Sequence, residues 1–334
     1  MPTIKEIASI AGVSPSTASI VLNGKSVERK IPKVTQDKVF EAAHKLDYHP
    51  NVSARRLRAQ SGESLVIAVF WASDFRAPMM VRFLRGLQEA ALTCGKKCEI
   101  MIHPYENDKL RNLTQAFEIC HVAIICNASE DDMRFLESYT FPVPIVLYNR
   151  SSQKFCTVNV NDSLLGEIPA KIFVKRHHKN AAVLNSEAIF PGMQIRIDSF
   201  LSEAKKSGLS VRQFYRENSM EGGYHGGEEI CRMNPLPDCL FCTSDFLAIG
   251  ALRALFQRKI SVPGQMEIIS IGNGDRELEE YACVSLSVVH LPMEKMAAAC
   301  LKLALDLLTG RVSPPCSIEL PIMYRERESC GDLQ

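Results

Sequence analysis

A chain of 334 residues, of which 46% are hydrophobic and 23% charged, is too long for one ordinary core. Its composition excludes disordered and fibrous classes. No stretch approaches the run of about 18 apolar residues that spans a membrane, and the start, MPTIKEIASIAG, lacks the pattern of a secretory signal. We therefore expect a cytoplasmic protein of two or three domains with no membrane partner.

The net charge is only +1, but it is unevenly distributed. Residues 1–62 carry ten Lys and Arg against five Asp and Glu, which leaves the remainder mildly acidic. A basic segment of this kind indicates contact with a polyanion such as DNA.

The twelve cysteines are scattered, and several, such as Cys126 and Cys300, lie in apolar runs typical of buried thiols. The pair that could suggest chemistry is Cys239 and Cys242 in PDCLFCTSD. This segment is typical of a buried strand, in which residues three apart point to opposite faces. Since no second Cys or His pair accompanies it, we predict no metal site and no cofactor.

The first twelve residues carry the signals of a capped helix. Thr3 and Glu6 have the spacing of a capping box, and Gly12 is placed to end the helix. The apolar residues that recur at helical spacing are Ile4, Ile7, Ala8 and Ala11.

A second helix follows after a tight turn. Ser14 is a favourable N-cap, Pro15 occupies the first helical position, and Asn23-Gly24 ends the helix. Its inner face would consist of Ala18, Val21 and Leu22. Two short helices joined in this way indicate a helix-turn-helix. The alternative is a helical hairpin without DNA contacts, but capping at both helix starts and the basic surroundings favour DNA binding.

A third helix is predicted from about Pro32 to Asp47, and Tyr48-His49-Pro50 ends it. The residues available to pack on the first two helices are Val34, Val39, Ala42, Ala43 and Leu46. The arginine-rich segment NVSARRLRAQSGES that follows has few apolar residues and, taken alone, is typical of a solvated linker.

From about Ser64 onward, short apolar runs alternate with amphipathic helical stretches, which indicates a parallel α/β architecture. The predicted strands are LVIAVF, CEIMIH, VAIIC, PIVLYN, NAAVLN, CLFCT and EIISIG. The predicted helices are APMMVRFLRGLQEAALTCG, GEIPAKIFVKRH, QIRIDSFLSEAKKSG and FLAIGALRALFQRK.

No motif of a hydrolase nucleophile, a phosphate-binding loop or a zinc protease is present, so we expect no catalytic residues and no enzyme. The glycines of GGYHGG, Gly222 to Gly227, lack the spacing of a dinucleotide-binding loop and are interpreted as a loop before a helix. The alternative function is a solute-binding module or a sugar-processing enzyme of the same fold.

The first sixty residues carry a close family resemblance. TIKEIASIAGVSPSTASIVLNGK, followed by VFEAAHKLDYHPNVSARRLR, resembles the head of the lactose-repressor and galactose-repressor (LacI/GalR) family. The segments SLVIAVF, PIVLYNR, VNVNDSLLG, FCTSDFLAIGALRAL, VPGQMEIISIG and LPMEKMAAACLKLALDLLTG follow in the family's order. The resemblance therefore covers nearly the whole chain.

It implies a transcriptional regulator of the repressor type, with an α/β fold preceded by an all-α head. The helix-turn-helix domain would span 1–49, the hinge helix 50–62, and the effector-binding and dimerisation domain 63–334. The last resembles periplasmic sugar-binding proteins and has two subdomains with parallel sheets. These are expected at 63–150 plus 290–320 and at 151–289 plus 321–330, with crossings near Asn149–Gln153, Val288–Met293 and Ile318–Met323.

The resemblance also implies that the helix from Ser14 to Asn23 enters the major groove of double-stranded DNA. The positions that usually touch base edges hold Pro15, Ser16 and Ile20, and those that contact phosphates hold Thr3, Ser14, Thr17, Ser19 and Asn23. Ile20 departs from the family's usual arginine or histidine, and it would pack on a thymine methyl rather than bind guanine.

The segment from Asn51 to Ala59 matches the family's hinge helix, in which Leu57 would wedge into the minor groove at the operator's centre. The hinge residues expected on DNA are Asn51, Ala54, Arg55, Leu57 and Arg58. Because the hinge pairs with a second copy, the resemblance implies a homodimer on a near-palindromic operator.

Ligands of such sheets bind beyond the carboxyl ends of the strands. The resemblance and this rule select five effector-binding candidates: Trp71, Ser73, Arg196, Asp245 and Asp275. They would suit a small polar effector, such as a sugar, a sugar derivative or a nucleobase-like molecule. Each has a plainer alternative, since Trp71 could be core, Arg196 a surface ion pair and Asp245 a helix cap.

Three departures from the family point away from a plain sugar. Gly274 replaces an acid that often holds effector hydroxyls, and Met79 and Met80 replace aromatic residues. His177-His178 resembles a glycine-histidine turn with a structural role.

With no heptad run after the last strand, we expect a dimer rather than a tetramer. Its interface is expected to include Met79, Phe83, Leu87, Ile249, Leu252 and Phe256.

Overall fold

The computed structural model describes residues 4–22, 26, 29, 31–46, 64–74, 79–188 and 190–331. The chain forms two compact units, Met1–Glu63 and Ser64–Gln334, which we call the head and the body. None of the described helices is long and apolar enough to cross a membrane.

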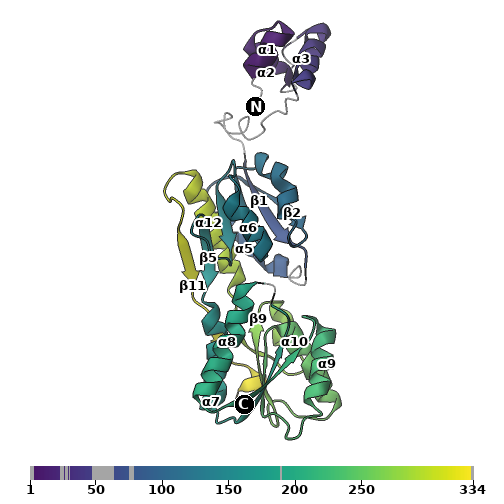
Figure 1. Ribbon diagram of the computed structural model, residues 1–334, viewed down its shortest axis with the longest axis vertical. Helices are drawn as coiled ribbons and strands as arrows, with labels where there is room; N and C mark the ends of the chain where they lie inside the picture. The colour runs from purple at the N-terminus through teal and green to yellow at the C-terminus, as the bar shows by residue number, and fades with distance from the viewer. Residues whose placement is uncertain are drawn as a thin grey trace. The chain divides into compact units, whose positions relative to one another are not determined.

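The head is built from α1 (Ile4–Ala11), α2 (Pro15–Leu22) and α3 (Lys33–Lys45) (Figure 1). Gly12 ends α1 with a φ of +65°, and the amide of Val13 donates to the Ala8 carbonyl at 2.9 Å. The small core holds most of the residues predicted to be inside: Ile7, Ala8, Ala11, Ala18, Val21, Val39, Ala42 and Ala43. This confirms the helical periodicity that the sequence shows.

One predicted core residue of the head is on the surface. Val34 is 67% exposed. Val39 lies five positions further along α3, and at about 100° per residue this places the two side chains about 140° apart around the helix. The prediction for Val34 was therefore wrong.

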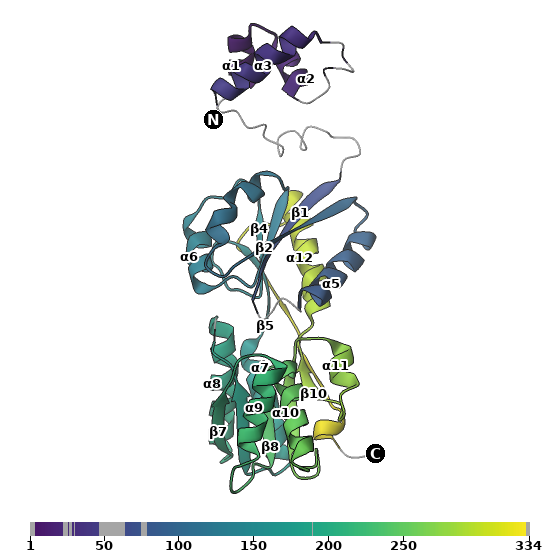
Figure 2. The same cartoon turned by 90° about the vertical axis from the view of Figure 1, so that its right-hand side faces the viewer.

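The body contains two sheets. The first has the strand order β11-β5-β4-β3-β1-β2, with every neighbouring pair parallel. Its strands are β1 (Leu65–Ala72), β2 (Cys98–Tyr105), β3 (Val122–Cys126), β4 (Ile145–Tyr148), β5 (Cys156–Val160) and β11 (Ser317–Leu320). The helical elements of this first subdomain are α5 (Met80–Thr93), η2 (Leu110–Glu118), α6 (Glu130–Ser138) and α12 (Met293–Leu308). In Figure 2, α5 and α12 lie on one side of the sheet and α6 on the other.

The second sheet has the order β12-β10-β9-β8-β6-β7 and is parallel except for β12, which runs antiparallel to β10. Its strands are β6 (Asn180–Asn185), β7 (Ser210–Tyr215), β8 (Cys239–Cys242), β9 (Glu267–Gly272), β10 (Ser287–His290) and β12 (Met323–Arg325). The helices of this second subdomain are α7 (Asp162–Lys175), α8 (Pro191–Lys206), α9 (Met220–Ile230), α10 (Asp245–Gln257), α11 (Arg276–Glu280) and the short η3 (Glu328–Cys330).

Both faces of each sheet are buried, and successive residues of a strand point to opposite faces. In β1, Ile67 packs with the core beside α5 and α12, whereas Ala68 packs with the core beside η2 and α6. The same alternation separates Cys239 from Cys242, which belong to cores on opposite faces of the second sheet. The predicted orientation of this cysteine pair is thus confirmed.

The chain crosses between the subdomains three times, and the first crossing differs from the prediction. Strand β5 pairs with β4 and β11 in the first sheet, so the chain crosses after Val160 rather than near 149–153. Polar Thr157 and Asn159 interrupt the apolar pattern of this segment, so the sequence did not predict it as a strand. The other two crossings lie between β10 and α12 and between β11 and β12, within the expected ranges.

The glycines of GGYHGG lie inside α9 rather than in a loop. A Cβ atom at Gly223 would lie 2.3 Å from the Leu247 carbonyl oxygen, and one at Gly250 would lie 2.0 Å from that of Met220. Glycine therefore allows the backbones of α9 and α10 to approach closely, which outweighs its poor helix propensity.

Candidate functional site

A cavity lies in the body where the carboxyl ends of the two sheets face each other. In this arrangement of the subdomains the cavity is narrow, with a volume of about 40 Å³. Asn127 and Asn149 directly follow β3 and β4, Asn185 ends β6, and Asn273 directly follows β9. Parallel strands that end together thus bring four amides to one place, as expected for ligand sites in such sheets.

Two further polar groups and several apolar side chains complete the walls. Asn218 and the hydroxyl-bearing Thr243 lie on the side of the second subdomain. The apolar part consists of Met79, Tyr148, Phe190, Met193, Leu291 and Met293. A mixed lining of this kind suits a small polar molecule with one apolar face.

Two buried arginines line the same cavity. Arg196 of α8 is 6% exposed and pairs with Asp162, with an Nη2–Oδ1 distance of 2.7 Å. Arg150, which follows β4, is 7% exposed and donates to the carbonyls of Ala128 and Asn149 at 2.5 and 2.6 Å. Both guanidinium carbons lie against the Phe190 ring, at 4.1 Å for Arg150 and 5.5 Å for Arg196.

Two polar atoms of the lining are buried without a hydrogen-bond partner among the described residues. These are the Tyr148 hydroxyl and the Asn273 side-chain oxygen. Burial raises the pKa of Tyr148, so its hydroxyl keeps its proton and remains a donor. Buried polar groups left unpaired are costly, which favours occupation of the cavity by water or by a polar ligand.

The structure brings only one of the five predicted effector-binding residues to the cavity wall, namely Arg196. Trp71 is buried one layer behind, with its ring 6.3 Å from that of Tyr148. Ser73 is exposed beyond β1, and Asp275 is exposed and caps α11 by accepting the Glu277 amide. Direct contact of these three with an effector remains a prediction that their positions do not favour.

Asp245 is buried and acts on the loop after β9. Its carboxylate accepts the Gly274 amide at 2.7 Å, and a Cβ atom at Gly274 would lie 2.6 Å from the same oxygen. The glycine that replaces the family's usual acid is therefore required by the position of Asp245. Burial, reinforced by the charge of Glu279, raises the pKa of Asp245 above its ordinary value.

A buried ionic cluster joins the subdomains beside the cavity. Arg82 of α5 makes two hydrogen bonds with Glu294 of α12, at 2.9 and 3.0 Å, and donates to the carbonyls of Gly274 and Leu291. Burial opposes ionisation of Glu294, but hydrogen bonds and attraction from Arg82 outweigh it and lower its pKa to about 2. Burial, then the charges of Arg82 and Arg276, lower the pKa of His290 to about 3, so this imidazole is neutral.

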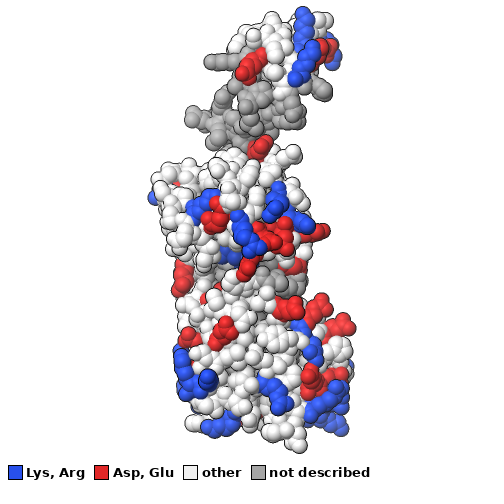
Figure 3. All heavy atoms as spheres, viewed as in Figure 1, with Lys and Arg blue, Asp and Glu red and all other residues white. Residues whose placement is uncertain are grey.

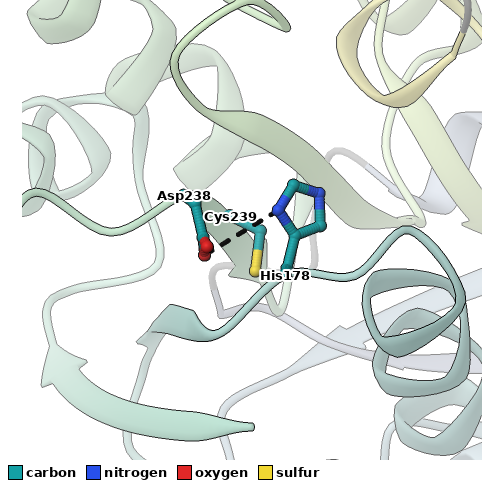
Figure 4. A group of neighbouring side chains, drawn as sticks. All are labelled: His178, Asp238 and Cys239. Carbon is teal, nitrogen blue, oxygen red and sulfur yellow. Dashed lines mark ion pairs between the residues drawn. The ribbon is translucent and has the colours of Figure 1, made fainter.

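A second group of titratable side chains lies at the opposite, amino end of the second sheet. Figure 4 shows His178 before β6 facing Asp238 and Cys239 at the start of β8, with Nδ1 of the histidine 3.8 Å from the carboxylate. Most of the atoms that could bind a metal ion already have partners within the protein. Asp238 accepts hydrogen bonds from the amides of Lys179 and Asn180, and His178 pairs with Glu267 at 2.8 Å.

Burial raises the pKa of Cys239 well above its ordinary value, which keeps the thiol protonated. His177, the residue after the C-cap of α7, adopts a φ of +65°, and the amide of His178 donates to the Phe173 carbonyl. The arrangement favours the structural role expected for the His177-His178 turn over metal binding.

In the head, α2 presents the candidate DNA-reading residues. The Ser14 hydroxyl accepts the Thr17 amide at 3.0 Å, which confirms the predicted N-cap. Ser14, Pro15 and Ser16 are exposed, whereas Thr17, Ser19 and Ile20 are half-buried. The other predicted DNA contacts lie outside the described residues: Thr3, Asn23, Asn51, Ala54, Arg55, Leu57 and Arg58.

The body offers DNA no comparable surface in the view of Figure 3. Lys and Arg side chains are interspersed there with Asp and Glu over the visible face. A single-sign basic patch, the usual footprint of a DNA contact, is absent from that face.

Comparison with known proteins decides the family. Residues 3–51 match the model described as "Bacterial regulatory proteins, lacI family", and residues 170–330 match "Periplasmic binding protein-like domain". A crystal structure of a LacI family transcription regulator from Clostridium acetobutylicum is 32% identical, with a TM-score of 0.76, over 79% of this chain and 100% of that chain. The chain belongs to the LacI family of transcriptional regulators.

Two further relatives agree with this assignment. The probable HTH-type transcriptional repressor ExuR of Bacillus subtilis (strain 168) is 26% identical over 316 residues, which cover 92% of each chain. The lac repressor dimer bound to operator and the anti-inducer ONPF has the same fold, with a TM-score of 0.70 at 17% identity, over 98% of this chain and 99% of that one. This LacI-family protein is accordingly a DNA-binding transcriptional repressor and not an enzyme.

The amides and the second arginine of the cavity were not predicted from the sequence, for which the candidates were a tryptophan, a serine, an arginine and two aspartates. Their place in the sequence could have identified three of the amides, because Asn127, Asn149 and Asn273 each come directly after an apolar strand. Arg150 follows in the same loop as Asn149. Polar residues just beyond predicted parallel strands would have identified most of this wall.

Proposed function

We propose that this LacI-family repressor binds a near-palindromic operator as a homodimer, and that a small polar effector in the body cavity changes its operator affinity. The observation that carries the proposal is the cavity itself, walled by five amides and two arginines from both subdomains. A ligand that contacts both subdomains stabilises one arrangement of the two relative to another. Binding in the cavity can in this way change the affinity of the head for the operator.

At the operator, α2 would lie in the major groove with Pro15, Ser16 and Ile20 toward the bases. Thr17 and Ser19 would contact phosphates, and Ser14 would add the amides of the helix N-terminus. Leu57 of the hinge segment would wedge between the central base pairs, flanked by Arg55 and Arg58.

The second copy would bind a surface formed by α10 and α11. Phe256 is 66% exposed and Tyr281 is 79% exposed, and with Ile249 and Leu278 they line a groove that we call the α10–α11 face. Exposed apolar surface of this kind marks interaction sites. The lac repressor that shares this fold is a dimer.

The interface predicted from the sequence needs correction in two places. Met79, Phe83 and Leu87 are buried in the body's own core, and so is Leu252. The opposite side of α5 faces solvent and exposes Val81 and Leu92. The residues of α5 that pack on the first sheet were mistaken for the exposed ones.

Selection of bound DNA from a random pool tests the proposal. The full chain, at moderate salt, should enrich a near-palindrome with two related half-sites. Enrichment of a single half-site would contradict the dimer, and salt-sensitive binding with no enriched sequence would contradict sequence-specific repression.

A further inference from the structure

Two cysteines lie side by side at the amino end of the first sheet. Cys94 is the C-cap residue of α5 and Cys98 is the first residue of β2, and their thiols are hydrogen-bonded with the sulfur atoms 3.7 Å apart. Gly95 has a φ of +69°, which glycine adopts without strain, and it turns the chain so that Cys98 returns to Cys94. A disulfide, with an S–S distance of about 2.05 Å, would require the two sulfur atoms to approach by roughly 1.6 Å.

The pair is open to a small oxidant. Both thiols are half-buried, whereas seven of the twelve cysteines are buried and thereby protected. The residues between the pair, Gly95, Lys96 and Lys97, are all exposed. Accessible thiols beside basic side chains are the ones that oxidants attack in proteins, and a second thiol at hydrogen-bond distance is placed to complete a disulfide.

The two thiols differ in reactivity. Burial, followed by the hydrogen bond and charge of Cys94, raises the pKa of Cys98 to about 11, although the charge of Lys96 opposes the rise. Since the thiolate is the nucleophile in thiol chemistry, the protonated Cys98 reacts second. Cys94 is consequently the residue that meets the oxidant first, and Cys98 is the resolving thiol beside it.

The pair lies next to the residues at which the body begins. Cys98 is the strand partner of Leu65 in the parallel pair of β1 and β2. The carbonyl of Lys97 accepts the Leu65 amide at 2.8 Å and the Ser64 hydroxyl at 3.3 Å. Ser64 is the first residue of the body, and the hinge segment, residues 50–62, precedes it in the sequence. A change in the loop between the two cysteines therefore acts on the point at which the hinge segment joins the body.

We propose that Cys94 and Cys98 are a reversible oxidation site, at which a hydroperoxide forms a disulfide that weakens operator binding. The Cys94 sulfur attacks the O–O bond of hydrogen peroxide, which yields a sulfenic acid and one water that carries the Cys94 proton. The Cys98 sulfur then attacks the Cys94 sulfur, and the hydroxyl group leaves as a second water with the Cys98 proton. The two sulfur atoms lose two electrons in all, and the two peroxide oxygens gain them. A dithiol reductant reverses the reaction by thiol–disulfide exchange.

Peptide mapping of the full chain tests the disulfide directly. Lys96 and Lys97 separate the two cysteines, so trypsin places them in different peptides, residues 86–96 and 98–109, with one cysteine each. Reduced protein treated with a small excess of hydrogen peroxide and then alkylated should yield these two peptides joined. Dithiothreitol should separate them, and a non-reducing gel should show the oxidised protein at the size of a single chain.

Operator binding before and after oxidation measures the consequence, which rests on the proposed function, whereas the disulfide itself does not. Oxidation should raise the operator Kd by about fivefold or more, and dithiothreitol should restore it. Cys94→Ser and Cys98→Ser should each abolish the response to peroxide. Cys231→Ser, at another half-buried cysteine, is the matched control and should retain it. Cys98→Ser should also accumulate a sulfenic acid at Cys94 that dimedone traps, because the resolving thiol is absent.

Three results would overturn the proposal. Peptides that stay separate after peroxide treatment would exclude the disulfide, and joined peptides from a species of two chains would place it between copies. A disulfide within one chain that leaves the operator Kd unchanged would exclude its effect on DNA binding. Reduced protein that selects no operator would instead contradict the proposed function, and the peptide map would still decide whether the disulfide forms.

Discussion

Arg82 and Glu294 form a two-point ion pair next to the cavity, with Nε–Oε1 and Nη2–Oε2 distances of 2.9 and 3.0 Å. Both belong to helices of the first subdomain, yet the same guanidinium also donates to the carbonyl of Gly274 in the second. Gly274 in turn donates its amide to Asp245. A single buried cation therefore connects the two subdomains beside the cavity.

Arg82→Met should lower the free energy of unfolding by about 3 kcal/mol, because it leaves the buried Glu294 carboxylate with only the more exposed Arg276 as a partner. Urea denaturation measures the change. The double variant Arg82→Met, Glu294→Gln should lose less than the sum of the single changes, since neither charge is then left alone. Additive losses would contradict the ion pair as the stabilising unit.

Acid should destabilise the body partly through Glu267. Burial opposes ionisation of this residue, but hydrogen bonds from His178 and Arg176 prevail and lower its pKa to about 2. A carboxylate with a depressed folded-state pKa stabilises the fold above its ordinary pKa of 4.5 and loses that contribution as pH falls toward 2. The loss is about 3 kcal/mol at most. Urea midpoints at several pH values should fall less steeply for Glu267→Gln than for the wild type, and equal slopes would refute this role.

Gly274→Ala should destabilise the body by about 1–3 kcal/mol, because the new methyl group would collide with the Asp245 carboxylate. Asp245→Ala removes that obstacle. The free energy of unfolding of the double variant should therefore exceed the value expected from adding the single effects. If the two effects are simply additive, another contact explains the glycine.

Tyr281→Glu should convert the proposed dimer into monomers, because it places a charge in the exposed α10–α11 face. Sedimentation of the wild type and the variant at equal concentration measures the state of each. Tyr139→Glu, at an exposed aromatic residue of the first subdomain, is the matched control. A variant that stays dimeric would show that the second copy binds elsewhere.

Ile20→Arg should shift the preferred base at the contacted position toward guanine, to which arginine can make two hydrogen bonds. Selection from a random pool with both proteins reveals the shift. Ile10→Arg adds the same charge at an exposed position of α1 and should strengthen binding without changing the preferred base. An unchanged preference for Ile20→Arg would show that residue 20 does not read bases.

Much of the fold could be predicted because buried parallel strands are continuous apolar runs. LVIAVF, VAIIC and EIISIG correspond to β1, β3 and β9. The strands that escaped are those with polar or exposed residues. Strand β5 alternates apolar residues with Thr157 and Asn159, and the edge strand β7 leaves most of its residues accessible. Periodicity alone cannot distinguish such segments from loops.

The site was harder to predict than the fold because its parts come from separate loops. Arg196 was selected through the family resemblance, and it does line the cavity. Asp245 was selected because it follows the predicted strand FCTS, but it packs against Gly274 rather than lining the wall. The pairing of Arg150 with Arg196 against one aromatic ring depends on how the subdomains pack, which a linear pattern does not contain.

The most direct test of the account measures operator affinity against ligand concentration. Fluorescence anisotropy with the selected operator and the full chain should show that a small polar ligand that raises Tm changes the operator Kd by about 5-fold to 150-fold. Operator should change the affinity of that ligand by the same factor, and Arg196→Met should abolish both effects at the concentrations that saturate the wild type. An operator Kd that stays within twofold at a saturating concentration of that ligand would contradict control of DNA binding through the cavity.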